Sequence, residues 1–148
     1  MNEIAALPHV PSREQIEALQ RELLKLPQCE PETSHYFADG MYARTVFRKA
    51  GTLIVGKVHK KEHFFALISG EISVWTEAGM KRVRAPFLWV SKPGTKRVTF
   101  AHEDSTAMTV HRVSSENLEA IEEELVETDA AALFGPGNIP LRPALEAS

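Results

Sequence analysis

Three histidines, one lysine and one arginine carry the chemistry that this sequence can offer: His59, His63, His111, Lys57 and Arg97. A neutral imidazole is a common metal ligand and a proton carrier. Ammonium and guanidinium groups instead bind carboxylates and phosphates. These residue types therefore predict a site for a metal ion, for a small anion, or for both.

Strand alternation decides whether these side chains can meet, because successive side chains of a β-strand point to opposite faces. Lys57 and His59 share one face of a predicted strand over 52–59. The other three side chains lie on the predicted strands 63–69, 96–101 and 106–113. If these faces line one barrel, all five side chains converge on its interior, and polar groups on otherwise apolar faces are typical of a binding cavity.

The surrounding sequence predicts an all-β domain. Short runs rich in β-branched and aromatic residues alternate with glycine and proline turns, and the predicted strands are 41–48, 52–59, 63–69, 72–76, 80–85, 87–91, 96–101 and 106–113. Such runs at near-regular spacing favour a small antiparallel barrel or sandwich. No helical period of useful length separates them, which argues against a parallel α/β fold.

A helix is expected on each side of the barrel. The first covers 12–26, where Ser12 and Gln15 have the spacing of a capping box and Pro27 ends the helix. The second begins after Ser114 or Ser115. The predicted organisation is an N-terminal helix and linker (1–34), a barrel (35–113), a C-terminal helix (114–126) and an extended tail (127–148).

Composition narrows the class of protein. The 148 residues suffice for one domain. The net charge of −3 does not suggest a general nucleic-acid binder. Cys29, the single cysteine, excludes an intramolecular disulfide. Because neither a signal peptide nor a run of about 20 apolar residues is evident, we expect a cytoplasmic protein without a membrane anchor.

The stretch 51–71 resembles the first motif of the cupin superfamily, in which glycines enclose His-x-His and a glutamate. Gly51 and Gly70 match the two glycines, and His59 matches the second histidine. His63 falls at the glutamate position and Lys57 at the first histidine. The resemblance covers about half of the chain and implies a jelly-roll barrel.

The second cupin motif, Pro-x-Gly-x-x-His, is similar to 91–97, with Arg97 at the histidine position. Lysine and arginine offer no lone pair to a metal, so the family's four-ligand site cannot form in the usual way. One interpretation keeps a divalent metal ion on His59 and His63, completed by Glu62 or His111. A second makes Lys57 and Arg97 an anion site. In a third interpretation, the charged ends of Lys57 and Arg97 extend out of the barrel into solvent. The histidines then form hydrogen bonds with neighbouring residues.

Segments at 37–40, 59–63, 85–87 and 91–97 are similar to small cupin-like proteins of tailed phages and prophages. This resemblance implies the cytoplasm of a bacterial host, and it makes a nucleotide a conceivable ligand. The favoured function is non-catalytic binding of a small anionic molecule, with no catalytic residue assigned. The alternatives are a metal-dependent cupin enzyme and an interaction protein that uses the barrel as a dimer scaffold. We expect a homodimer, because open strand edges are normally covered.

Overall fold

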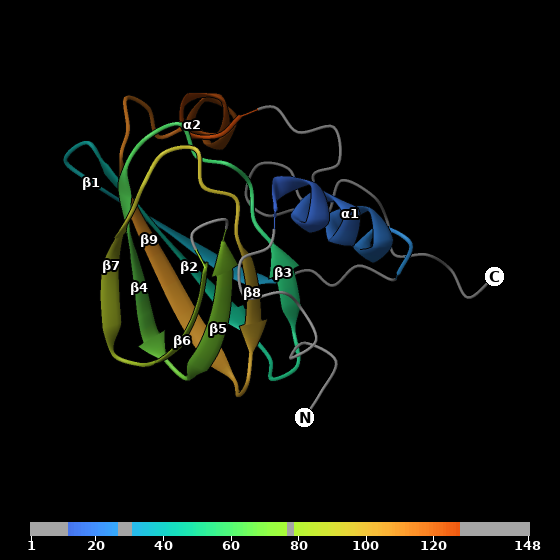
Figure 1. Ribbon diagram of the computed structural model, residues 1–148. Coiled ribbons are helices and arrows are strands. Elements are labelled where there is room, and N and C mark those ends of the chain that lie inside the picture. Colours follow the sequence, from blue (N-terminus) through green and yellow to red (C-terminus); the bar gives the residue numbers. More distant parts are fainter. Residues whose placement is uncertain (1–11, 27–30, 77–78, 128–148) are drawn as a thin grey trace.

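The computed structural model describes residues 12–26, 31–76 and 79–127. Two antiparallel sheets face each other and enclose the core (Figure 1). The first sheet contains, in spatial order, β1 (Glu32–Ala38), β2 (Met41–Arg48), β9 (Ser105–Arg112), β4 (His63–Ser69) and β7 (Phe87–Ser91). The second contains β3 (Leu53–Val55), β8 (Val98–Ala101), β5 (Glu71–Thr76) and β6 (Gly79–Arg84). The predicted antiparallel jelly roll flanked by two helices is confirmed.

Most strand predictions hold, and β2, β4 and β7 have the predicted bounds. The expected strand over 52–59 was too long. Regular pairing ends after Val55, because β3 has only three partners on β8. The chain then runs irregularly to His59, which forms an isolated bridge with Val126.

One strand was missed. The expected linker over 27–34 was wrong for 32–34, where the chain already belongs to β1. β1 alternates between exposed and half-buried residues, so it has no apolar face that the sequence could reveal. Backbone pairing with β2 along its whole length holds it at the edge of the sheet. Residues 27–30, which include Cys29, lie outside the described residues.

An apolar cluster closes one end of the space between the sheets. It consists of Phe65, Leu67, Ile72, Val74, Val83, Ala101 and Ala107. Gly70 makes the tight turn from β4 to β5 with a φ of +90°, and an added Cβ would lie 2.1 Å from the Ser105 hydroxyl oxygen. The sharp turn and the close approach of β9 explain the glycine at this position.

Both helices pack against the barrel (Figure 1). α1 (Arg13–Leu23) begins with the predicted Ser12–Gln15 capping box and buries Ile16 against Val55, Trp75 and Val98. α2 (Leu118–Leu125) begins later than expected, because Asn117 is its N-cap.

The expected caps of α2 make other contacts. The Ser114 hydroxyl donates to Glu124, and the Ser115 hydroxyl accepts a hydrogen bond from the Asn117 backbone. The predicted tail lies outside the described residues from 128 onward. Within the described ranges, no helix is both long and apolar enough to cross a bilayer.

Candidate metal and anion site in the barrel

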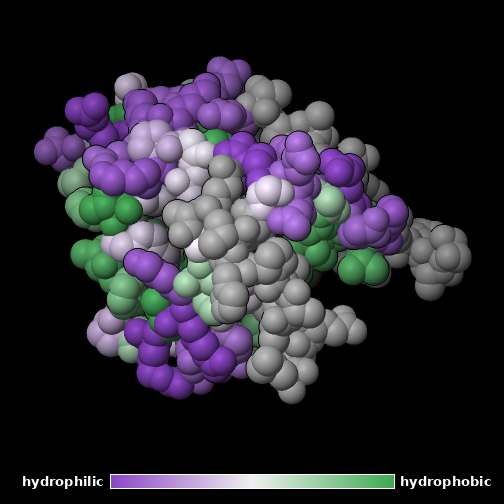
Figure 2. Space-filling model, viewed as in Figure 1, coloured by the Kyte–Doolittle hydropathy of each residue, from purple (hydrophilic) through white to green (hydrophobic). Residues whose placement is uncertain are grey.

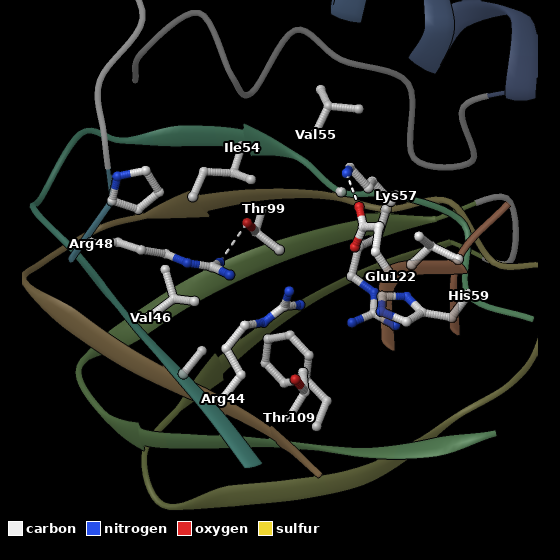
Figure 3. A pocket seen from close by; sticks show the side chains of 16 residues that line it. Arg44, Val46, Arg48, Ile54, Val55, Lys57, His59, Thr99, Thr109 and Glu122 are labelled. Atoms are coloured by element: carbon white, nitrogen blue, oxygen red, sulfur yellow. Dashed lines mark hydrogen bonds and ion pairs between the residues drawn. The ribbon is translucent and has the colours of Figure 1, made fainter. Parts of the chain in front are cut away.

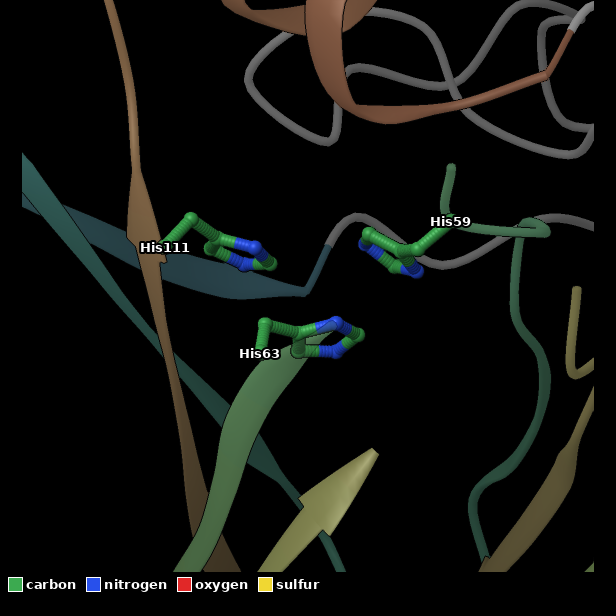
Figure 4. Close-up of side chains that lie close together, drawn as sticks. All are labelled: His59, His63 and His111. Atoms are coloured by element: carbon green, nitrogen blue, oxygen red, sulfur yellow. The ribbon is translucent and has the colours of Figure 1, made fainter. Parts of the chain in front are cut away.

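Three histidine rings meet inside the barrel (Figure 4). His59 comes from the loop after β3, His63 begins β4, and His111 lies near the end of β9. The ring centroids of His59 and His63 are 4.3 Å apart, and His111 lies 5.3 Å from the first and 4.5 Å from the second. His59 and His63, which the sequence predicts to converge on the interior, thus have adjacent rings.

Local pairing explains why the rings converge. β4 buries His63, Phe65 and Leu67 on its inner face. Since β4 pairs with β9 through Phe64 and Val110, His63 lies beside His111 on the neighbouring strand. The segment after α2 fixes His59, because His59 bridges to Val126 and the Lys60 backbone donates to Leu125.

Burial keeps all three imidazoles neutral. Burial, which is the largest cause, acts together with nearby positive groups to lower the pKa of His59 to about 2, of His63 to about 4 and of His111 to about 3. Arg44 and Arg97 are among those groups for all three rings. At neutral pH the site therefore presents lone pairs, as a metal centre requires.

Hydrogen bonds indicate which ring nitrogens are available. His63 Nδ1 lies 3.2 Å from the Lys61 carbonyl oxygen, which can only accept, so this nitrogen donates. His63 Nε2 then carries a lone pair, and it is buried without a hydrogen-bond partner. His111 Nε2 lies 2.9 Å from the Thr109 hydroxyl. Such contacts orient imidazoles in metal sites.

The donor set fits a divalent transition metal. One nitrogen from each ring lies within 4.8 Å of the other two. Bonds of about 2.0–2.1 Å in a tetrahedral site need nitrogens roughly 3.3 Å apart, so the rings would have to approach one another to hold an ion. Glu62 is exposed and lies 2.6 Å from the Lys92 ammonium. His111, rather than Glu62, is therefore the third residue of the cluster.

Three arginines lie next to the histidines. Arg44 and Arg48 occupy alternate positions on β2 and share its inner face, while Arg97 precedes β8. All three line one cavity of about 100 Å³ with His59 and Phe65. Figure 3 shows the guanidinium groups of Arg44 and Arg48 directed into this cavity.

The arginines have few partners. Arg48 donates to the Thr99 hydroxyl at 2.6 Å. Arg97 donates to the Ser91 hydroxyl and lies over the Phe65 ring, 5.0 Å from its centroid. The Nε atoms of Arg44 and Arg48 are buried without a hydrogen bond. In the described part of the chain, no carboxylate forms an ion pair with any of the three.

Lys57 lines the same cavity, but its ammonium forms an ion pair with Glu122 of α2 (Figure 3). A protein carboxylate therefore already compensates this charge. Two other acidic residues, Glu62 and Glu103, form ion pairs with Lys92 and Arg84 and not with the basic residues of the cavity. The structure thus brings together His59, His63, His111 and Arg97. Lys57 lies beside them with its charge compensated by Glu122.

Sequence reasoning missed Arg44, Arg48 and Glu122. A signal for the arginines existed, since alternation along the predicted strand 41–48 puts both on one face with Tyr42 and Val46. The contact between Glu122 and Lys57 joins residues 65 positions apart. It depends on how α2 docks, which no local pattern reveals.

No protein-family model and no curated protein matches this sequence. Solved structures do resemble its fold. The cupin domain of Cnp3 from Schizosaccharomyces pombe is 17% identical with a TM-score of 0.50, over 60% of this chain and 68% of that one. KdgF from a Halomonas species is 14% identical with a TM-score of 0.52, over 60% and 85%.

A larger protein shares the same architecture. Salicylate 1,2-dioxygenase from Pseudaminobacter salicylatoxidans is 10% identical with a TM-score of 0.54, and the match covers 76% of this chain but 35% of that enzyme. At these identities the likeness concerns the fold and not the chemistry. The jelly roll described above is therefore a cupin-type fold.

Proposed function

We propose that the protein binds a small carboxylate- or phosphate-bearing molecule inside the barrel, beside the three histidines. The observation that carries this proposal is the set of guanidinium groups at the cavity without a carboxylate partner in the described part of the chain. Cations taken out of water are costly unless an opposite charge compensates them. A bound anion supplies that charge, and guanidinium groups bind oxyanions through paired hydrogen bonds.

The cavity favours a small ligand. Its volume is about 100 Å³, whereas an apolar cavity of about 150 Å³ accommodates benzene. A whole nucleotide is larger than this cavity, which is partly open to solvent, so the size of the cavity gives no positive support to the nucleotide ligand that the sequence made conceivable. An inorganic oxyanion or a short carboxylate fits it better.

A divalent metal ion is the second part of the proposal. His59, His63 and His111 would hold it, and the observation that favours it is the buried, unpartnered Nε2 of His63. When bound, such an ion would act as a Lewis acid on an oxygen of the neighbouring anion. This arrangement keeps a metal-dependent enzyme as the alternative to a non-catalytic binding protein.

Two measurements test these proposals together. Elemental analysis and native mass spectrometry of the purified protein identify a co-purified metal or small molecule. Thermal melts with acetate, malonate, sulfate and phosphate measure anion binding. We expect anions to raise the melting temperature of the wild type but not of Arg97→Ala, while Arg21→Gln on the exposed side of α1 behaves as the wild type. Equal responses of Arg97→Ala and the wild type would contradict the anion site.

We also propose that two copies of the chain associate through the outer face of the five-stranded sheet. One row of side chains crosses all five strands, and strand pairing aligns its members: Tyr36, Ala43, Val110, Phe64 and Val90. A second row contains Ser34, Thr45, Met108, Ala66 and Leu88.

Neither row contains a charge, and Leu88 is 63% exposed. Hydrophobic residues gather on the side of the molecule formed by β7 (Figure 2). Two uncharged rows can contact their own copies across a two-fold axis without like-charge repulsion. Light scattering should give twice the chain mass of 16.5 kDa, and a monomer at micromolar concentration would contradict this association.

A further inference from the structure

The arginines of β2 suggest what kind of anion the cavity accepts. Arg44 and Arg48 lie one on each side of Val46 on the inner face of the strand, so their side chains extend into the same space (Figure 3). Arg97 reaches this space from the opposite sheet, where it precedes β8. Guanidinium groups from both sheets therefore surround one cavity.

Charges at the cavity do not balance. Four basic side chains line it, namely Arg44, Arg48, Lys57 and Arg97, against a single carboxylate, Glu122. Glu122 is paired with Lys57. His59 is neutral because burial holds its pKa near 2. Three positive charges therefore remain without a counter-charge among the described residues.

These three charges influence one another. Burial, followed by repulsion from Arg97 and Arg44, lowers the pKa of Arg48 to about 10. Burial and then Arg44 lower the pKa of Arg97 to about 10. Both groups remain protonated at neutral pH, so the repulsion persists in the empty protein. A monoanion would leave two of the three charges uncompensated, whereas a dianion leaves one.

The unused hydrogen-bond donors of the arginines also favour a dianion. A guanidinium has five N–H donors in a fixed plane. Arg48 and Arg97 use one donor each on Thr99 and Ser91, and Arg44 forms no hydrogen bond with a described residue. The unused donors suit a ligand with several acceptor oxygens. The cavity volume of about 100 Å³ is smaller than the roughly 150 Å³ that accommodates benzene, which favours a compact ligand.

We propose that Arg44, Arg48 and Arg97 form a cage selective for a compact oxyanion with two negative charges, of the size of phosphate, sulfate or a short dicarboxylate. This inference rests on the proposed anion-binding function and specifies the ligand class of that site. It assigns Arg44 and Arg48 as ligand-binding residues and treats Lys57 as part of the cavity wall.

Isothermal titration calorimetry at constant ionic strength tests the cage. Sulfate, phosphate and malonate are titrated into the wild type at pH 7.5, with acetate and nitrate as monoanions. The wild type should bind the dianions at least about tenfold more tightly than the monoanions. A hydrogen bond to a charged group contributes about tenfold to a hundredfold in affinity, so Arg44→Gln and Arg48→Gln should each reduce dianion binding by that factor.

Control variants show whether a loss of binding is specific to the arginines of the cavity. Arg21→Gln, a charge change of the same size on the exposed side of α1, should bind as the wild type does. Thermal melts verify that each variant is folded, and Arg48→Lys, which keeps the charge but loses the planar fork, should retain part of the affinity. Arg44→Gln without ligand should be at least as stable as the wild type, because it removes an uncompensated cation.

The possible failures are distinguishable. If the wild type binds monoanions as tightly as dianions, the cage is wrong and the proposed anion site remains. If the arginine variants keep the wild-type preference, other residues select the ligand and the cage is also wrong. If no anion binds the wild type, the proposed function fails together with the cage.

Discussion

The same strands present opposite chemistry on the two faces of the five-stranded sheet. On the inner face, β2 carries Arg44 and Arg48, and β4 begins with His63. On the outer face, β4 carries Phe64 and Ile68, which are 48% and 49% exposed. Cations and imidazoles thus line the interior, while large apolar side chains contact solvent in the isolated chain.

The stability of the isolated chain does not account for the charged residues of the inner face or for the apolar residues of the outer face. Exposed apolar area and enclosed uncompensated charge both cost free energy. At the closed end of the barrel the interior is apolar. Leu67 and Ile72 are fully buried there, as in an ordinary protein core. We propose that the charged interior and the exposed apolar side chains are adapted to other molecules, an anion or metal ion inside and a second copy outside.

The largest effect is expected on the outer face. Phe64→Glu places a carboxylate in the middle of the uncharged row, and a charge buried without a partner costs several kcal/mol. We expect this variant to be a monomer, whereas Met80→Glu on the other sheet should keep the wild-type mass. Light scattering of both variants at equal concentrations measures their masses. A dimeric Phe64→Glu would place the interface elsewhere.

At the closed end of the interior, substitutions should act on stability alone. Leu67→Ala removes a side chain that is 1% exposed and should lower the free energy of unfolding by about 2–5 kcal/mol. Arg44→Met at the polar end should lower it by less than about 1 kcal/mol, or raise it. Urea denaturation of both variants gives the comparison. A loss at Arg44 as large as that at Leu67 would mean that the polar end is structural.

Metal binding should depend on the three clustered histidines. Zinc at a hundred times its dissociation constant should stabilise the wild type by about 2.7 kcal/mol. His63→Ala should lose this gain, because Nε2 of His63 is the buried nitrogen without a partner. His102→Ala, outside the cluster, should keep it. Thermal melts with and without zinc measure the difference, and an equal gain in His63→Ala would exclude the site.

Acid should weaken the folded state through the same histidines. Their folded pKa values lie below the usual 6.5, so the unfolded chain binds more protons as the pH falls from about 6.5 toward the folded values of about 4 for His63, 3 for His111 and 2 for His59. Stability is complete above that window and falls within it, by about 1.4 kcal/mol per pH unit for each histidine protonated only on unfolding. The charged groups that face the cluster are Arg44 and Arg97.

Urea denaturation between pH 7.5 and 4.5 measures this dependence. The control is the double variant His63→Gln, His111→Gln, which should show a flatter curve than the wild type in that window. Parallel curves for the two proteins would contradict the assignment of neutral, buried imidazoles.

The sequence predicted much of the fold because its signals are local. Alternation and turn residues defined β2, β4 and β7, and the glycine and histidine spacing indicated the cupin-type barrel and the pair His59 and His63. β1 escaped prediction because an edge strand held by backbone pairing needs no apolar pattern. The pairing of Lys57 with Glu122 escaped it because the contact depends on the docking of α2.

A crystal structure grown with selenate tests the central claim most directly, because selenium reports its own position by anomalous scattering. We expect one selenium peak in the cavity, with oxygens about 2.7–2.9 Å from guanidinium nitrogens of Arg44, Arg48 and Arg97. An empty cavity at saturating selenate, or guanidinium groups turned away toward solvent, would contradict the assignment of the barrel interior as an anion site.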